Sequence, residues 1–166
     1  MFDDLLGANQ TYASHFALAG VPAQAAKGFA LVTCMDSRIE PLAMLGLVPG
    51  DAKILRNAGG RATVDVVRSL VLATTFLGVR RVAVMHHTGC ALAGQSDEGV
   101  REGVSAAGRG SADRWEFLAM PDPDAALLQD VELIRSCPLL PADTPVVGWR
   151  YDVETGLVQT VVAPAG

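Results

Sequence analysis

The chain has little charge and few cysteines for its length. Of its 166 residues 19% are charged, and 13 basic residues against 18 acidic ones leave a formal net charge of −5. This acidic balance disfavours nucleic acid as a partner, because phosphate binding calls for a basic surface. Three cysteines are an odd number, so free or metal-bound thiols in a reducing cytoplasm fit the chain better than a disulfide framework.

Long apolar runs are also missing from the sequence. No run reaches the roughly 18 residues of a membrane helix, and the acidic start of the chain differs from a signal peptide. We therefore expect a cytoplasmic protein without a membrane partner. Half of the residues are nevertheless hydrophobic, which suggests an additional buried surface, either in a helix-flanked parallel sheet or at an oligomer interface.

The hydrophobic pattern alternates between strands and helices. Strands are predicted over Phe29–Thr33, Lys53–Leu55, Arg81–His86, Pro145–Arg150 and Leu157–Val162. Between the second and third of these lies a strong helical pattern capped by Thr63, and before the fourth lies another, capped by Asp122 with Pro123 at its first position. Weaker helical patterns cover 1–19 and 97–108.

This alternation predicts an α/β fold in a single domain, 1–166. We expect three layers, with helices on both faces of a mostly parallel sheet of order 2-1-3-4. A short connection joins the last two strands, so the final strand should be antiparallel. In such sheets ligands bind beyond the carboxyl ends of the strands, where the strand order reverses. That point lies between the first and third strands.

Residues that can bind a metal follow both of these strands. Cys34 comes directly after the first strand, and His87 and Cys90 follow the third. Two thiolates and one imidazole are a ligand set of zinc sites that keep a fourth position open. The alternative is two buried, apolar-like cysteines and a structural histidine. Because both segments fall at the expected crevice, the sequence favours the zinc site.

Two charged residues accompany the first proposed ligand. Asp36 lies two residues beyond Cys34, so its carboxylate can reach the metal or a water molecule on it. Arg38 can hold that carboxylate in a bidentate pair, which would keep Asp36 ionised beside the open position. Taken alone, Asp36 and Arg38 would be an ordinary ion pair that caps the next helix.

Together these segments resemble the β-class carbonic anhydrases, and the short chain resembles their compact members. The resemblance rests on Cys34-Met35-Asp36-Ser37-Arg38, on His87-Thr88-Gly89-Cys90, on Arg56-Asn57-Ala58-Gly59-Gly60 and on the Tyr151–Gly156 hairpin. It covers a core over 25–163, preceded by a helical arm over 1–24.

The resemblance implies a zinc lyase, a carbonate dehydratase. Its zinc-bound hydroxide would convert carbon dioxide, a small-molecule substrate, reversibly to bicarbonate and a proton. It implies Zn²⁺ on Cys34, His87 and Cys90, with Asp36 and Arg38 as the catalytic pair. It also implies that the backbone of Ala58, Gly59 and Gly60 lines the pocket, and that the protein is a homodimer or a dimer-built oligomer.

The sequence departs from the family pattern beside the last ligand. The family usually has glycine directly after the second cysteine ligand, whereas Ala91 and Leu92 follow Cys90 here. This leaves hydrolysis of carbonyl sulfide or carbon disulfide at the same site as an alternative. Another alternative is a zinc protein without catalysis, in which Asp36 closes the site as a fourth ligand.

Three further side chains carry structural expectations. His86 should point to the opposite face of its strand from His87, because side chains alternate along a strand. It is therefore expected to pack, or to support the site from behind, and not to bind the metal. Trp115 and Trp149 are expected to be packing residues.

Overall fold

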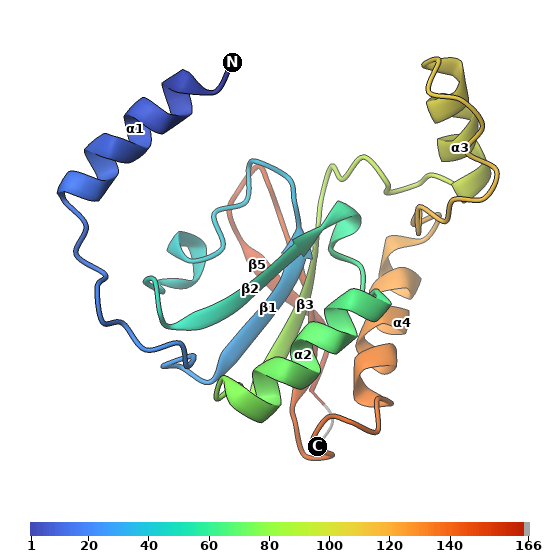
Figure 1. Cartoon of the computed structure of the whole chain (residues 1–166). Coiled ribbons are helices and arrows are strands. Elements are labelled where there is room, and N and C mark those ends of the chain that lie inside the picture. Colours follow the sequence, from blue (N-terminus) through green and yellow to red (C-terminus); the bar gives the residue numbers. More distant parts are fainter. Residues whose placement is uncertain (165–166) are drawn as a thin grey trace.

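The computed structural model describes residues 1–164 and contains one five-stranded sheet (Figure 1). The strands are β1 (Phe29–Cys34), β2 (Ala52–Asn57), β3 (Arg81–His87), β4 (Val146–Tyr151) and β5 (Val158–Val162). Their order is β2-β1-β3-β4-β5, and all neighbours are parallel except the antiparallel pair β4–β5. The predicted order and the antiparallel final strand are confirmed.

The helices are α1 (Asp3–Ser14), α2 (Val64–Phe76), α3 (Asp97–Ala106) and α4 (Pro123–Arg135), with 3₁₀ turns η1 (Ala43–Leu45) and η2 (Ala58–Gly60). Both predicted caps are confirmed. The Thr63 side chain accepts a hydrogen bond from the backbone N–H of Val66. The Asp122 side chain accepts from the backbone N–H groups of Asp124 and Ala125. Such side-chain oxygens pair the free N–H groups of the first helical turn.

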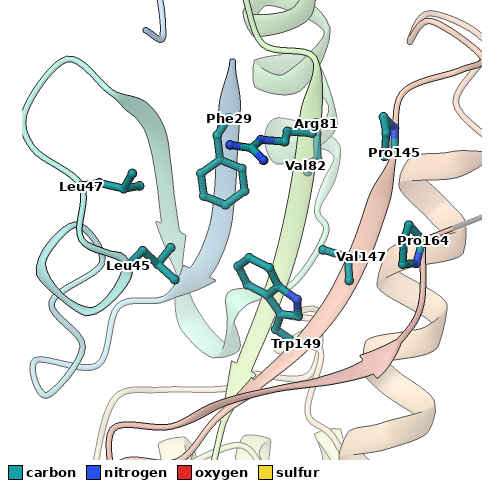
Figure 2. A pocket seen from close by; sticks show the side chains of 9 residues that line it. All are labelled: Phe29, Leu45, Leu47, Arg81, Val82, Pro145, Val147, Trp149 and Pro164. Carbon is teal, nitrogen blue, oxygen red and sulfur yellow. The ribbon is translucent and has the colours of Figure 1, made fainter. Parts of the chain in front are cut away.

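The two faces of the sheet pack in different ways. α2 and α4 cover one face (Figure 1), where Leu70 and Val131 pack against Val32 and Val84 of the sheet. The other face is packed by the segment that follows β1 and contains η1. This face keeps a groove of about 390 Å³ (Figure 2). The groove is lined by Phe29, Leu45, Leu47, Arg81, Val82, Pro145, Val147, Trp149 and Pro164.

The N-terminal helix α1 lies apart from the sheet (Figure 1). No residue of α1 is buried within the described chain. The large apolar side chains exposed on and around it are Met1, Phe2, Leu5, Leu6, Tyr12 and Phe16. No helix in residues 1–164 is long and apolar enough to cross a membrane.

The expectation for the tryptophans is confirmed in one case. Trp149 packs against Phe29, with ring centroids 6.0 Å apart. Trp115 is 67% exposed, so its prediction as a packing residue was wrong. It lies in the irregular segment after α3, a helix that itself has no buried residue.

Candidate active site

Cys34, His87 and Cys90 meet at the carboxyl end of the sheet. Cys34 is the last residue of β1, His87 is the last residue of β3, and Cys90 lies in the turn beyond it. Their two sulfurs and one imidazole nitrogen all lie within 4.8 Å of one another. A tetrahedral zinc ion would hold such atoms about 3.5–3.8 Å apart, since its bonds to sulfur and nitrogen are about 2.3 and 2.0 Å long. The arrangement therefore suits a zinc ion.

The imidazole of His87 is oriented as a metal ligand. Its Nδ1 lies 2.9 Å from the carbonyl oxygen of Thr88, and because a carbonyl accepts only, Nδ1 must carry the proton. Nε2 then has a free lone pair, and it is buried without a hydrogen-bond partner in residues 1–164. Burial lowers the pKa of His87, which favours the neutral ring that metals bind.

The thiol of Cys90 is also suited to bind a metal cation. Burial raises the pKa of Cys90, and the neighbouring Cys34 raises it further. A metal ion reverses this preference, because a coordinating thiol is deprotonated. Two buried sulfurs facing an unpaired imidazole nitrogen are thus the donor set that zinc prefers.

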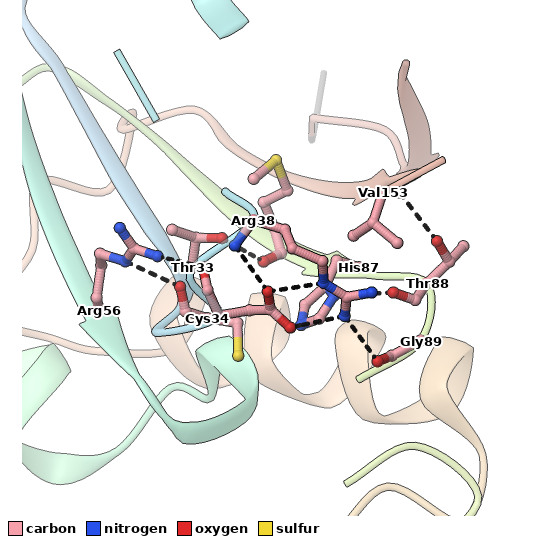
Figure 3. A network of polar contacts seen from close by, with 10 residues as sticks. Thr33, Cys34, Arg38, Arg56, His87, Thr88, Gly89 and Val153 are labelled. Carbon is pink, nitrogen blue, oxygen red and sulfur yellow. Dashed lines mark hydrogen bonds and ion pairs between the residues drawn. The ribbon is translucent and has the colours of Figure 1, made fainter. Parts of the chain in front are cut away.

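Arg38 (Figure 3) forms the predicted bidentate pair with Asp36 beside these atoms. Arg38 Nε lies 2.9 Å from Asp36 Oδ1, and Arg38 Nη2 lies 2.7 Å from Asp36 Oδ2. These hydrogen bonds from Arg38 hold the pKa of the Asp36 carboxyl well below its usual range. Asp36 Oδ2 lies 3.8 Å from His87 Nε2. An ionised hydrogen-bond acceptor therefore stands beside the three metal-capable atoms.

Arg38 also connects the two segments of the site. Its Nη2 donates to the carbonyl oxygen of Gly89 at 3.0 Å, so one guanidinium contacts both the loop after β1 and the turn after β3. Thr88 adds a second connection, because its hydroxyl accepts a hydrogen bond from the backbone N–H of Val153 at 3.1 Å. The β4–β5 hairpin is thereby fixed against the turn that bears Cys90.

A pocket of about 480 Å³ opens over these residues. It is lined by Cys34, Met35, Asp36, Ser37, Arg38, Ala58, Gly59, Cys90, Ala91 and Leu92. Ala58 and Gly59 are among these lining residues, whereas Gly60, for which the resemblance implied the same position, is not. A Cβ on Gly60 would stand 2.9 Å from the backbone nitrogen of Cys34 and 3.0 Å from the carbonyl oxygen of Met85. This close approach holds η2 against the ends of β1 and β3.

Comparisons with known proteins agree with this geometry. A family profile described as carbonic anhydrase matches residues 29–113. Beta-carbonic anhydrase 1 of Mycobacterium tuberculosis is 33% identical over 159 residues, which cover 96% of each chain. The chain belongs to the β-carbonic anhydrase family.

Two further proteins similar to this β-carbonic anhydrase are named for different substrates. The crystal structure of a carbonic anhydrase from Streptococcus mutans superposes with a TM-score of 0.90 at 39% identity and covers 96% of both chains. A carbon disulfide hydrolase from Acidianus sp. (strain A1-3) is 34% identical over 148 residues, 75% of this chain and 72% of that one. The same fold and sequence pattern therefore occur in proteins named for different substrates.

His86 lies on the opposite face of β3 from the site of this β-carbonic anhydrase, as predicted. Its Nε2 is 3.0 Å from Asp130 Oδ2 on α4, and Arg61 Nε is 2.7 Å from the same oxygen. Burial alone would raise the pKa of Asp130, but hydrogen bonds from His86 and Arg61 lower it. This buried cluster connects β3, α4 and the residue after η2. The sequence pattern gives no signal for it.

Proposed function

We propose that this β-carbonic anhydrase hydrates carbon dioxide reversibly to bicarbonate and a proton, with a zinc ion held by Cys34, His87 and Cys90. The observation that carries the proposal is the convergence of these three ligand atoms beside the Asp36–Arg38 pair. The family consists of zinc enzymes, and the three side chains fit zinc in number, in type and in spacing.

Zinc bound at this site would lower the pKa of a water molecule towards neutrality and so supply a nucleophile at physiological pH. Asp36 orients that nucleophile. Its carboxylate is ionised and fixed by two hydrogen bonds from Arg38. It would therefore accept a hydrogen bond from the nucleophile, whose oxygen lone pair would then face the pocket. Held in this way, Asp36 acts as an acceptor and not as a proton source.

The pocket walls suit a small apolar substrate. Ala58, Ala91 and Leu92 contribute apolar surface, against which carbon dioxide can lie without losing hydrogen bonds. Asp36 is 20% exposed and Arg38 is 48% exposed, so solvent reaches the pair. Bicarbonate and the released proton can therefore leave directly to water or buffer.

The relation to carbon disulfide hydrolases favours a second candidate, the hydrolysis of carbon disulfide or carbonyl sulfide at the same site. These linear molecules would meet the same nucleophile, so the wall of the pocket decides between them. Parallel assays of the zinc-loaded chain on carbon dioxide and carbon disulfide test the proposal. Faster turnover of carbon dioxide supports it, and turnover of carbon disulfide alone would replace it with the second candidate.

A zinc protein without catalysis is the remaining alternative. In that case Asp36 would leave Arg38 and close the site as a fourth ligand. Crystal structures of the zinc-loaded protein at acidic and alkaline pH separate the two cases. A carboxylate paired with Arg38 at alkaline pH, together with activity, supports catalysis. Four protein ligands at every pH, with no activity, would show a structural site.

We also propose that the protein is a homodimer or a dimer-built oligomer. The support is α1, which has no buried residue in the described chain and carries exposed apolar side chains, Leu5 and Leu6 among them. Burying such a surface against a second copy would be favourable. Light scattering on the zinc-loaded protein would give the mass.

The free thiols of Cys34 and Cys90 agree with a cytoplasmic location, where thiols stay reduced.

A further inference from the structure

Arg56 holds the turn between the first proposed ligand, Cys34, and the Asp36 carboxylate. The last backbone bond that ties this segment to β2 runs from the N–H of Met35 to the carbonyl oxygen of Asn57, at 2.9 Å. Beyond Met35 the chain leaves the sheet. At this point the Arg56 guanidinium reaches over from the end of β2 (Figure 3). Its Nε donates to the carbonyl oxygen of Cys34 at 3.0 Å, and its Nη2 donates to that of Asp36 at 2.6 Å.

These two bonds fix the backbone on both sides of Met35. The carbonyl oxygen of Asp36 also accepts a hydrogen bond from the backbone N–H of Ile39 at 3.1 Å. This one oxygen therefore connects the turn both to Arg56 and to the residues that follow it. The position of this backbone decides whether the Asp36 carboxylate meets both nitrogens of Arg38, since a bidentate pair requires one fixed geometry. Arg56 is not among the residues that line the pocket, so it acts through Asp36.

We propose that Arg56 is a positioning residue that clamps the turn after β1 and thereby keeps the Asp36 carboxylate on Arg38 and out of the zinc site. This inference rests on the proposed function, because it concerns the same site. The planar fork of arginine places two donors side by side, whereas the single ammonium of lysine cannot span the two carbonyls in the same way. Binding both carbonyl oxygens therefore requires the two donors of the guanidinium group, and a positive charge alone is not enough.

The test compares zinc-loaded, full-length Arg56→Met with the wild-type protein. The side chain is exposed, so its truncation leaves no cavity in the core. We expect kcat to fall about 10- to 100-fold, because a misplacement of about 1 Å in a catalytic group has effects of that size. KM should change less than kcat, and the zinc content should stay equal to that of the wild type. Arg56→Lys should recover only part of kcat.

The control variant is Arg68→Met, which also removes a surface arginine paired with an aspartate, Asp65 on α2. It should keep the kcat of the wild type. A crystal structure of Arg56→Met provides a readout independent of activity, and there Asp36 should have lost at least one of its two bonds to Arg38. A variant with unchanged kcat, or a slow variant in which the pair is unmoved, would overturn the proposal.

The structural readout also separates this inference from the proposed function. If the wild-type protein failed to hydrate carbon dioxide, the proposed function would be wrong, while a displaced Asp36 in Arg56→Met would still support the clamp. If Arg56→Met failed to fold, Arg56→Lys would decide in its place. A structure of Arg56→Lys with both carbonyl bonds intact, together with the kcat of the wild type, would refute the need for the guanidinium.

Discussion

Replacing Gly60 by alanine should destabilise the protein far more than the same change at Gly59. Both glycines have a positive φ, +70° and +77°, so alanine meets the same left-handed strain of about 1–2 kcal/mol at either position. The surroundings differ. At Gly60 the new Cβ meets only backbone, with Cys34 N and Thr33 C at 2.9 Å and Met85 O at 3.0 Å. Backbone of two sheet strands cannot move aside cheaply.

At Gly59 the nearest atoms belong to side chains. Leu92 Cδ1 would lie 3.2 Å and Arg61 Cγ 3.3 Å from the new Cβ, and small rotations of these side chains relieve the contact. Overpacking at Gly60 should add about 1–3 kcal/mol to the strain of about 1–2 kcal/mol, so Gly60→Ala should lose about 2–5 kcal/mol of stability in total. Gly59→Ala should lose about 1–2 kcal/mol.

Urea denaturation and thermal unfolding at one protein and zinc concentration measure the difference. In a chain of this size 1 kcal/mol corresponds to about 2–4 °C in Tm, so Gly60→Ala should melt at least about 4 °C below the wild type. It should also bind zinc more weakly, because its clash displaces the backbone of Cys34. Equal losses of stability in the two variants would refute the assignment of Gly60 as a contact point between η2 and the sheet.

Two further predictions concern the pocket and the buried cluster. Leu92→Ala should raise the turnover of carbon disulfide relative to that of carbon dioxide, because it removes bulk from the pocket wall; a constant ratio in parallel assays would argue against this role. The lowered pKa of Asp130 stabilises the folded state above the ordinary pKa of an aspartate, about 3.9, and this stability is lost as the pH falls through the lowered value. Asp130→Asn should therefore be less stable at pH 7. It should also show a weaker loss of stability as the pH falls below the ordinary pKa of an aspartate; identical pH profiles in urea titrations would contradict this.

The sheet and the main site could be predicted because both depend on local signals. Short apolar segments between capped helices indicate parallel strands, and residues directly after two neighbouring strands must meet at one edge of the sheet. For this reason Cys34, His87 and Cys90 were brought together correctly. The Asp36–Arg38 pair follows from a spacing of two residues.

Other features of the site depend on contacts that no local pattern records. The clamp from Arg56 spans 20 residues to Asp36, and the bond between His86 and Asp130 spans 44 residues. An arginine at a strand end and an aspartate on an amphipathic helix resemble ordinary surface residues in the sequence. The exposure of Trp115 was equally unpredictable, because the size and apolarity of a tryptophan favour burial wherever the fold allows it.

The central claim is that zinc is held by Cys34, His87 and Cys90 while Asp36 and Arg38 direct the reaction. Stopped-flow hydration of carbon dioxide by wild-type protein and Arg38→Ala, at equal measured zinc content, tests it most directly. We expect Arg38→Ala to keep its zinc and to lose at least about 100-fold in kcat, the scale of one misplaced catalytic group. Full turnover by Arg38→Ala would contradict the role of the pair.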